Sequence, residues 1–318
     1  MTTMKALQVT KTEGTPTLTF TDVRKPTLRP GYIIVQVKAS AIQPSDIVNS
    51  KGGFPQTTFP RVVGRDYSGV IVEGPVNFMR NEVFGTSGDK QAFTVDGAQA
   101  EFILVPEDAV APKPKSLTFT QAATVGVPFT TAGITLKRSG AKRGDNVLVV
   151  GANGAVGSAV VQLAKGKGCR VLEASRHETA DINTAKDPEM KSVDVLTDGK
   201  GVEVVIDTVG QPEMTRAAIS KLARGGTLAF IAGPKSGNQD LTFNMVDFYQ
   251  TERNLVGVNS LWYTAEELAT ELKTVSEMFD NDLLEAGKEW EQVKLKDAVE
   301  AYGKASLRGA AKYVVVIE

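Results

Sequence analysis

Between residues 146 and 164 the chain reads Asn146-Val-Leu-Val-Val-Gly151-Ala-Asn-Gly154-Ala-Val-Gly157-Ser-Ala-Val-Val-Gln-Leu-Ala. Four apolar residues in a row follow Asn146, as in a strand that is buried on both faces. Three glycines then fall within seven residues, and a helical stretch continues to Lys167. The stretch therefore predicts a buried strand, a tight glycine turn and a helix over residues 155–167.

This strand–turn–helix unit is typical of a site that binds the pyrophosphate of a dinucleotide. Glycine allows the tight turn, lets the backbone approach the phosphates and permits close packing of the helix on the strand. The helix N-terminus adds free N–H groups and partial positive charge. Ala152 takes the first position of the usual Gly-x-Gly-x-x-Gly pattern, directly after Gly151. We expect the dinucleotide to be bound by Gly151, Asn153, Gly154, Ala155, Val156 and Gly157.

The end of the next strand distinguishes NAD from NADP. NAD requires an Asp or Glu there, about 20 residues beyond the turn, which accepts a hydrogen bond from the ribose 2′-OH. Here Ser175 takes that place and Arg176 follows it. We expect NADP(H), because a guanidinium binds a phosphate in bidentate fashion. Glu173 keeps NAD as an alternative, since a register shift of two residues would let it accept from the ribose.

From Asp145 onward, strands and helices alternate along the chain. We expect strands over residues 146–150, 170–174, 202–206, 227–231 and 254–259, and helices over 155–167 and 214–222. This alternation predicts a doubly wound parallel sheet, the Rossmann architecture.

The first third of the chain instead consists of short strands separated by Gly and Pro. These strands are expected over residues 4–9, 17–20, 32–38, 68–72, 82–85 and 100–106, and they predict a compact β-barrel or sandwich. A helical stretch follows Thr118 and runs to Leu136, and another covers about 265–279. The last strand, 312–317, fits the β-rich domain better than a parallel sheet. We therefore expect one domain of residues 1–122 with 265–318, and a dinucleotide-binding domain of residues 123–264.

Composition narrows the class of protein further. The 318 residues carry 36 Lys+Arg against 37 Asp+Glu, which argues against a broad basic face for nucleic acid. No run approaches the roughly 20 apolar residues of a membrane span, and no apolar segment typical of a signal peptide follows Lys5. Cys169 and His177 are the only residues of their kinds, which removes most zinc sites and catalytic triads. We expect a cytoplasmic protein whose chemistry comes from its cofactor.

Several segments now resemble a known family in their order and spacing. They are Val63-Gly64-Arg-Asp66-Tyr-Ser-Gly69-Val, Gly97-Ala-Gln-Ala-Glu101-Phe-Ile-Leu-Val-Pro106, Ala122-Ala-Thr-Val-Gly126 and Val205-Ile-Asp207-Thr-Val-Gly210. Together with the glycine turn, they resemble the zinc-independent quinone oxidoreductase branch of the medium-chain dehydrogenase/reductase superfamily. The resemblance covers the whole chain and implies an α/β fold, with a GroES-like β-rich catalytic domain and a Rossmann domain.

Zinc alcohol dehydrogenases of this superfamily carry a Cys and a His at positions where this chain has Gln43 and Arg65. The resemblance therefore implies no metal site and direct hydride transfer from NADPH to a quinone. An NADPH-dependent enone or enoyl double-bond reductase is the alternative within enzymes. A non-enzymatic NADPH-binding structural or RNA-binding protein is the alternative of another class.

The resemblance also implies roles for individual residues. Gln43 stands where quinone reductases usually have Asn, and it is expected to donate to the acceptor oxygen or, alternatively, to cap a loop. Asp46 is expected to order the site. Thr131, or its neighbour Thr130, is a candidate for contact with the nicotinamide ribose or carboxamide, and an ordinary helical role is the alternative.

Three further expectations concern charge and loops. Gly233 follows a strand at the edge of the sheet where such folds bind cofactor. Arg308 takes the place from which relatives reach a phosphate late in the chain. Arg65 and Asp66 are interpreted as a structural ion pair.

The strand 254–259 is expected to be the last of the parallel sheet. An edge strand this apolar is normally covered or paired. In relatives it pairs with its copy in a second subunit, so we expect a homodimer.

Overall fold

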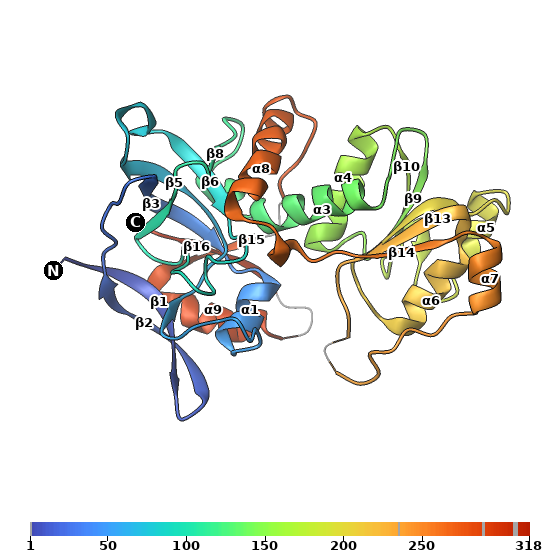
Figure 1. Ribbon diagram of the computed structural model, residues 1–318, viewed down its shortest axis with the longest axis horizontal. Helices are drawn as coiled ribbons and strands as arrows, with labels where there is room; N and C mark the ends of the chain where they lie inside the picture. Colours follow the sequence, from blue (N-terminus) through green and yellow to red (C-terminus); the bar gives the residue numbers. More distant parts are fainter. Residues whose placement is uncertain (1, 235, 288–289, 308–310) are drawn as a thin grey trace. The chain divides into compact units, whose positions relative to one another are not determined.

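The computed structural model describes residues 2–234, 236–287, 290–307 and 311–318 (Figure 1). The chain forms two compact units. Unit 1 comprises Met1–Val127 with Leu261–Glu318, and unit 2 comprises Pro128–Ser260. The dinucleotide-binding domain was expected over residues 123–264. Unit 2 is shorter at both ends, since it begins at Pro128 and ends at Ser260.

Unit 1 is the β-rich part of the molecule. A three-stranded sheet has the order β2 (Thr15–Arg24), β1 (Thr3–Thr12) and β4 (Arg61–Val62). A larger sheet has the order β15 (Trp290–Lys294), β16 (Lys312–Val316), β3 (Tyr32–Ala41), β5 (Asp66–Glu73), β6 (Glu82–Thr86) and β8 (Ala111–Pro112), and β7 (Phe102–Pro106) also pairs with β3. The strand β16 pairs antiparallel with the end of β3, so the chain ends in unit 1.

Helices complete unit 1. They are α1 (Pro44–Ser50), α2 (Phe119–Ala122), α8 (Ala265–Asp280) and α9 (Ala298–Ala305), with short 3₁₀ turns η1 (Val76–Phe78), η2 (Ser260–Trp262) at the boundary and η3 (Leu295–Asp297). The core contains alternate residues of β3, Ile33, Val35 and Val37, together with the ring of Tyr67. These three residues share one face of β3, as the period of two along a strand predicts, and Ile34 on the other face is also buried.

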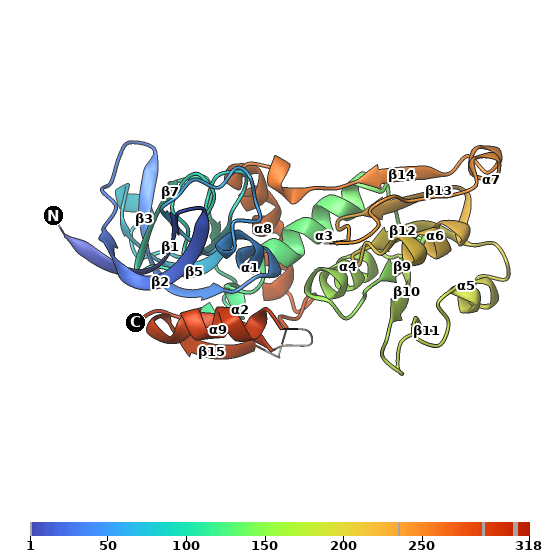
Figure 2. The same ribbon diagram turned by 90° about the horizontal axis from the view of Figure 1, so that it is seen from below.

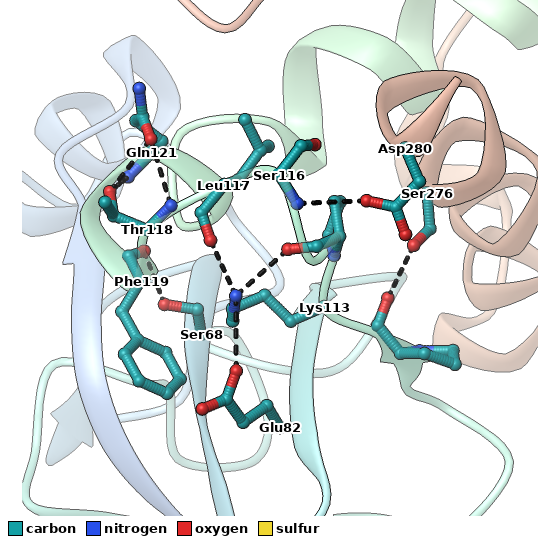
Figure 3. A network of polar contacts seen from close by, with 12 residues as sticks. Ser68, Glu82, Lys113, Ser116, Leu117, Thr118, Phe119, Gln121, Ser276 and Asp280 are labelled. Atoms are coloured by element: carbon teal, nitrogen blue, oxygen red, sulfur yellow. Dashed lines mark hydrogen bonds and ion pairs between the residues drawn. The ribbon is translucent and has the colours of Figure 1, made fainter. Parts of the chain in front are cut away.

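Polar contacts join the end of β8 to its surroundings in unit 1 (Figure 3). The ammonium of Lys113 donates to the carbonyls of Pro114 and Leu117 at 3.0 and 2.6 Å and lies 3.2 Å from Oε2 of Glu82. On the side of α8, Ser276 Oγ donates to the carbonyl of Pro112 at 2.8 Å. These contacts fix the segment that leads into α2.

Unit 2 contains a six-stranded sheet in which all pairs are parallel. Its order is β11 (Ile182–Asn183), β10 (Arg170–Ser175), β9 (Asn146–Val150), β12 (Val202–Asp207), β13 (Leu222–Phe230) and β14 (Asn254–Gly257). The helices are α3 (Gly126–Arg138), which begins in unit 1, α4 (Ala155–Gly166), α5 (Lys191–Leu196), α6 (Pro212–Ser220) and α7 (Met245–Gln250). The predicted fold class, a β-rich domain with a doubly wound parallel sheet, is confirmed.

The order of strands places β9 in the middle of the sheet. Figure 2 shows α4 and α6 beside this sheet. Strands β10 and β12 lie on opposite sides of β9. Open α/β sheets bind ligands at such a point, beyond the carboxyl ends of the strands. The glycine turn follows β9 directly and therefore lies at that point.

Among the described residues, no helix combines the length and apolar character that crossing a membrane requires.

Candidate active site and dinucleotide site

The glycine turn after β9 has the tight geometry that its sequence predicts. Gly151 has φ +84°, and a Cβ added there would lie 2.5 Å from Oγ1 of Thr208. A Cβ on Gly157 would lie 2.1 Å from the carbonyl oxygen of Gly151. Glycine is thus required both to make the turn and to let α4 pack against it.

The first turn of α4 begins at this glycine turn. Gly154 is the N-cap residue, and no side chain caps the helix. The first N–H groups of a helix have no acceptor within it, so those of Ala155, Val156 and Gly157 are available to an anion. Asn153 is exposed beside them. The arrangement fits the pyrophosphate of a dinucleotide.

Asp207 holds the neighbouring loop in place, and the sequence analysis assigned it no role. Its Oδ1 accepts from the amides of Val209 and Gly210 at 2.8 and 3.0 Å, and its Oδ2 accepts from Thr215 Oγ1. Thr208 Oγ1 donates to the carbonyl of Val150 at 2.9 Å. These bonds tie the carboxyl ends of β9 and β12 together. Asp207 lies in the segment Val205-Ile-Asp207-Thr-Val-Gly210, and an acidic residue at the end of a buried strand is the sequence feature that indicates this role.

The structure places Ser175 and Arg176 at the end of β10. Because Ala174 pairs with Val150, Ser175 lies beyond the pairs that join β10 to β9, beside the glycine turn. Its Oγ accepts from the amide of His177 at 3.1 Å. Arg176 is exposed, and its guanidinium forms no hydrogen bond or ion pair with the part of the chain that the structure describes.

Glu173 is engaged elsewhere in unit 2. Its Oε1 lies 2.8 Å from the ammonium of Lys165 on α4. The carboxylate that kept the NAD alternative open is thus paired with a helix residue. Ser175, two residues beyond Glu173, is the residue at the end of β10.

Two other expected cofactor residues lie in unit 2. Gly233 lines a cavity of about 150 Å³ beyond β12 and β13, together with Gly210, Thr215 and Leu241. Thr131 is buried in α3, and its Oγ1 has no hydrogen-bond partner among the described residues. A buried hydroxyl without a partner is unfavourable, so this atom fits a role toward a bound group. Arg308 lies outside the described residues.

In unit 1 the structure brings four polar side chains together: Gln43, Asp46, Arg65 and Asp66. They are 1%, 0%, 3% and 0% exposed, respectively. Gln43 is the N-cap of α1, and its backbone N–H donates to Oδ2 of Asp46 at 2.8 Å. Its side-chain Nε2 donates to Oδ2 of Asp66 at 2.8 Å. Gln43 and Asp46, the two catalytic candidates from the sequence, thus belong to one buried cluster.

The two carboxyl groups of this cluster differ in their partners. Asp66 also accepts a hydrogen bond from Thr86 Oγ1. The backbone amide of Val127 donates to both oxygens of Asp66, 2.9 Å from Oδ1 and 2.8 Å from Oδ2. Burial raises the pKa of Asp66 to about 6, against the lowering effect of these bonds. Burial raises the pKa of Asp46 to about 7, with the Arg65 charge opposing it. Oδ1 of Asp46 has no hydrogen-bond partner among the described residues.

The predicted ion pair between Arg65 and Asp66 is wrong. Arg65 Nε donates to Ser87 Oγ at 2.6 Å and Nη1 donates to Ser45 Oγ at 2.9 Å. No nitrogen of the Arg65 guanidinium lies within ion-pair distance of a carboxylate among the described residues. The physical reason is that amide and hydroxyl donors already occupy Asp66, while two serines orient the guanidinium.

Sequence reasoning missed Ser45, Ser87 and Phe93. The guanidinium carbon of Arg65 lies 5.7 Å from the centroid of the Phe93 ring, and Phe54 meets that ring edge-on at 5.3 Å. Ser45 stands beside Asp46, which was a signal; Ser87 and Phe93 follow β6 and come near only through the fold. Tyr67 lies in the core of unit 1. Among the described residues, no group of three His, Cys, Asp or Glu side chains is arranged to hold a metal ion.

Comparison with known proteins agrees with the two-part fold. Residues 29–115 match the family described as alcohol dehydrogenase GroES-like domain, and residues 155–277 match the family described as zinc-binding dehydrogenase. Positions 43 and 65 lie outside residues 155–277, so the match to the zinc-binding dehydrogenase family does not concern these two positions.

Full-length relatives resemble the chain over most of its length. A zinc-type alcohol dehydrogenase-like protein of Schizosaccharomyces pombe is 41% identical over 318 residues, covering 99% of this chain and 97% of that protein. A quinone oxidoreductase of Mus musculus is 28% identical, covering 83% and 82%. The structure of a mycobacterial quinone oxidoreductase superposes with a TM-score of 0.81 at 25% identity, covering 98% of this chain and 99% of the other.

Proposed function

Because this chain belongs to the medium-chain dehydrogenase/reductase superfamily, in its quinone oxidoreductase branch, we propose that it is an NADPH:quinone oxidoreductase that uses no metal ion. We further propose that it works as a homodimer in the cytoplasm. The observation that carries the proposal is the cluster of Gln43 and Arg65 in unit 1. An amide and a guanidinium there donate hydrogen bonds, whereas a zinc site needs electron-pair donors.

The proposal assigns the cofactor to unit 2. The glycine turn and the first amides of α4 bind the pyrophosphate, and Ser175 with Arg176 binds the 2′-phosphate. Two observations support this assignment: among the described residues, neither the guanidinium of Arg176 nor the hydroxyl of Thr131 has a hydrogen-bond partner. When bound, the reduced nicotinamide supplies a hydride to the acceptor.

The proposal assigns the acceptor to the polar cluster of unit 1. Asp66 accepts one Nε2 hydrogen of Gln43, which fixes the orientation of the amide and leaves the second hydrogen for the acceptor oxygen. Asp46 accepts from the backbone of Gln43 and so positions the start of α1. Quinones suit this site because they spread negative charge over a conjugated carbonyl and need no strong Lewis acid.

The test follows the absorbance of reduced nicotinamide with quinones and with enones as acceptors, in the presence of a metal chelator. We expect chelator-resistant quinone turnover that prefers NADPH over NADH. Turnover of enones alone would assign the protein to the double-bond reductases. Tight NADPH binding without turnover of either class would favour a non-enzymatic role.

A variant tests the cofactor assignment in the same assay. Arg176→Gln is expected to raise the KM for NADPH about tenfold or more and to leave that for NADH unchanged, because it removes a charged hydrogen bond to the phosphate. The exposed Arg216→Gln on α6 serves as the matched control. Equal effects on both nucleotides would contradict the assignment of Arg176.

A further inference from the structure

Arg65 is a buried cation that makes no direct contact with a carboxylate of the described residues. It is 3% exposed, and its described hydrogen bonds go to two neutral hydroxyl groups, those of Ser45 and Ser87. Asp46 and Asp66 are near enough to act on it through space, and they oppose the lowering of its pKa by burial. A buried charge without a direct partner is costly, so a fold that keeps one is prepared for an anion.

The hydrogen bonds of Arg65 leave part of the guanidinium free. Five N–H groups lie in one plane, and the two serines accept one from Nε and one from Nη1. Nη2 has no acceptor among the described residues. The two serines therefore fix the plane of the group and leave Nη2 as a donor pair with a set direction.

We propose that Arg65 is a catalytic residue, whose Nη2 donates hydrogen bonds to the carbonyl oxygen of the acceptor and whose charge stabilises that oxygen as it becomes negative. This inference rests on the proposed function and deepens it. It names the substrate class as conjugated carbonyl compounds in which hydride addition leaves an oxyanion. Arg65 then takes the electrostatic role that a Lewis acid has in zinc dehydrogenases.

When bound, the reduced cofactor would supply one hydride, carrying two electrons, which forms a C–H bond at the carbon β to the acceptor carbonyl. The π electrons of the C=C and C=O bonds shift toward the carbonyl oxygen, and Arg65 holds the resulting enolate oxyanion until it takes one proton from water, which leaves as hydroxide. The enol of an enone then tautomerises to the saturated ketone. With a quinone, a proton of the newly reduced carbon moves to the second carbonyl oxygen, which gives the hydroquinone.

The experiment compares Arg65→Gln and Arg65→Lys with the wild type and with the control Arg61→Gln. Arg61 is a nearby cation of unit 1 that pairs with Asp96, 2.8 Å away, outside the polar cluster. Removing one donor from an oxyanion site typically lowers kcat about 10²–10³-fold. We expect that loss in Arg65→Gln with unchanged KM for NADPH, partial recovery in Arg65→Lys and no effect in Arg61→Gln.

A second readout uses inhibition rather than turnover. 4-Nitrophenol resembles one half of a hydroquinone, and its phenolate resembles the oxyanion. We expect the wild type to bind the phenolate more tightly than the phenol, measured as competitive inhibition against the quinone across pH. Arg65→Gln should lose this preference about tenfold or more, while a merely structural defect would weaken both forms equally.

The outcomes separate this inference from the proposed function. A wild type that reduces neither quinones nor enones overturns both. Wild-type turnover with Arg65→Gln within about threefold of it overturns only the role of Arg65. A wild type that prefers the neutral phenol, or an Arg65→Gln variant that retains the phenolate preference, also overturns that role.

Discussion

At the scale of single residues, the buried cluster of unit 1 contains a carboxyl group, that of Asp46, whose pKa is raised. Asp46 is fully buried, and within the described part of the chain one of its oxygens accepts a hydrogen bond while the other has no partner. Burial favours the neutral form of a carboxyl group, which raises its pKa. The cluster also contains a cation, Arg65, whose guanidinium donates hydrogen bonds to the hydroxyl groups of Ser45 and Ser87. Among the described residues, the cluster therefore holds an arginine and two buried carboxyl groups that form no direct ion pair with it.

The pKa of Asp46 has a consequence for stability that can be measured. Its pKa rises from the ordinary value of 3.8 to about 7 on folding, so the folded state binds the proton more tightly than the unfolded state. The stabilisation is complete below pH 3.8 and is lost as pH rises through about 7. At most about 4 kcal/mol is involved, at 1.36 kcal/mol per pKa unit.

Asp46→Asn keeps an oxygen for the Gln43 amide and cannot ionise. We therefore expect the variant to gain stability relative to the wild type as pH rises from 4 to 8, by up to a few kcal/mol. Urea unfolding at several pH values measures this difference. The exposed Asp22→Asn, which breaks a surface ion pair with Lys5, serves as the control. A difference between Asp46→Asn and the wild type that does not change with pH would contradict the argument.

At the scale of elements, sequence patterns predicted best where one local signal sufficed. The apolar run and three glycines predicted β9, the turn and α4 within one residue of their observed ends. The two-residue strand β11 and the six-residue α5 were missed. Helix α5 begins after Met190, which has φ +52° and provides no side-chain cap, so it carries no start signal.

The helical stretch expected from Thr118 to Leu136 is in fact two helices. Thr118 caps α2 as its sequence predicts, but α2 ends at Ala122 and α3 begins at Gly126. A Cβ on Gly126 would lie 2.4 Å from Oδ1 of Asp66, and the next amide donates to both oxygens of that carboxylate. The break thus provides a hydrogen bond to the site. Gly126 and Pro128 are local signals of this break, because proline is tolerated in the first turn of a helix and not in its interior.

The segment between β8 and α2 depends on one buried ammonium. Lys113 has a side chain 6% exposed and three oxygen partners (Figure 3). Lys113→Met keeps the apolar stem and leaves the carbonyls of Pro114 and Leu117 without this donor, at a cost of about 1–3 kcal/mol. The expected result is a lower urea midpoint. The neighbouring Lys115→Met, which is exposed, should leave the midpoint unchanged.

At the scale of the whole molecule, the parallel sheet ends in an edge strand. β14 pairs with β13 on one side, and no described strand pairs with it on the other. The amide of Val258 donates to the carbonyl of Phe230, so by alternation the backbone groups of Leu255 and Gly257 face outward. Leu255 and Val256 are half-buried. An apolar edge with free backbone groups is suited to pairing with a second copy.

Gly257→Pro tests this pairing with little effect on the fold. Proline removes the outward N–H of residue 257, whereas the bonds between β14 and β13 use the groups on the other side. A Cβ at this position meets only the Phe230 ring, at 3.7 Å, which is ordinary contact. In sedimentation, the wild type should have twice the mass of the 33.9 kDa chain, and Gly257→Pro should be monomeric. Gly257→Ala keeps the N–H and should remain a dimer. A dimeric Gly257→Pro variant would place the interface elsewhere, because a continuous sheet across two copies depends on that donor.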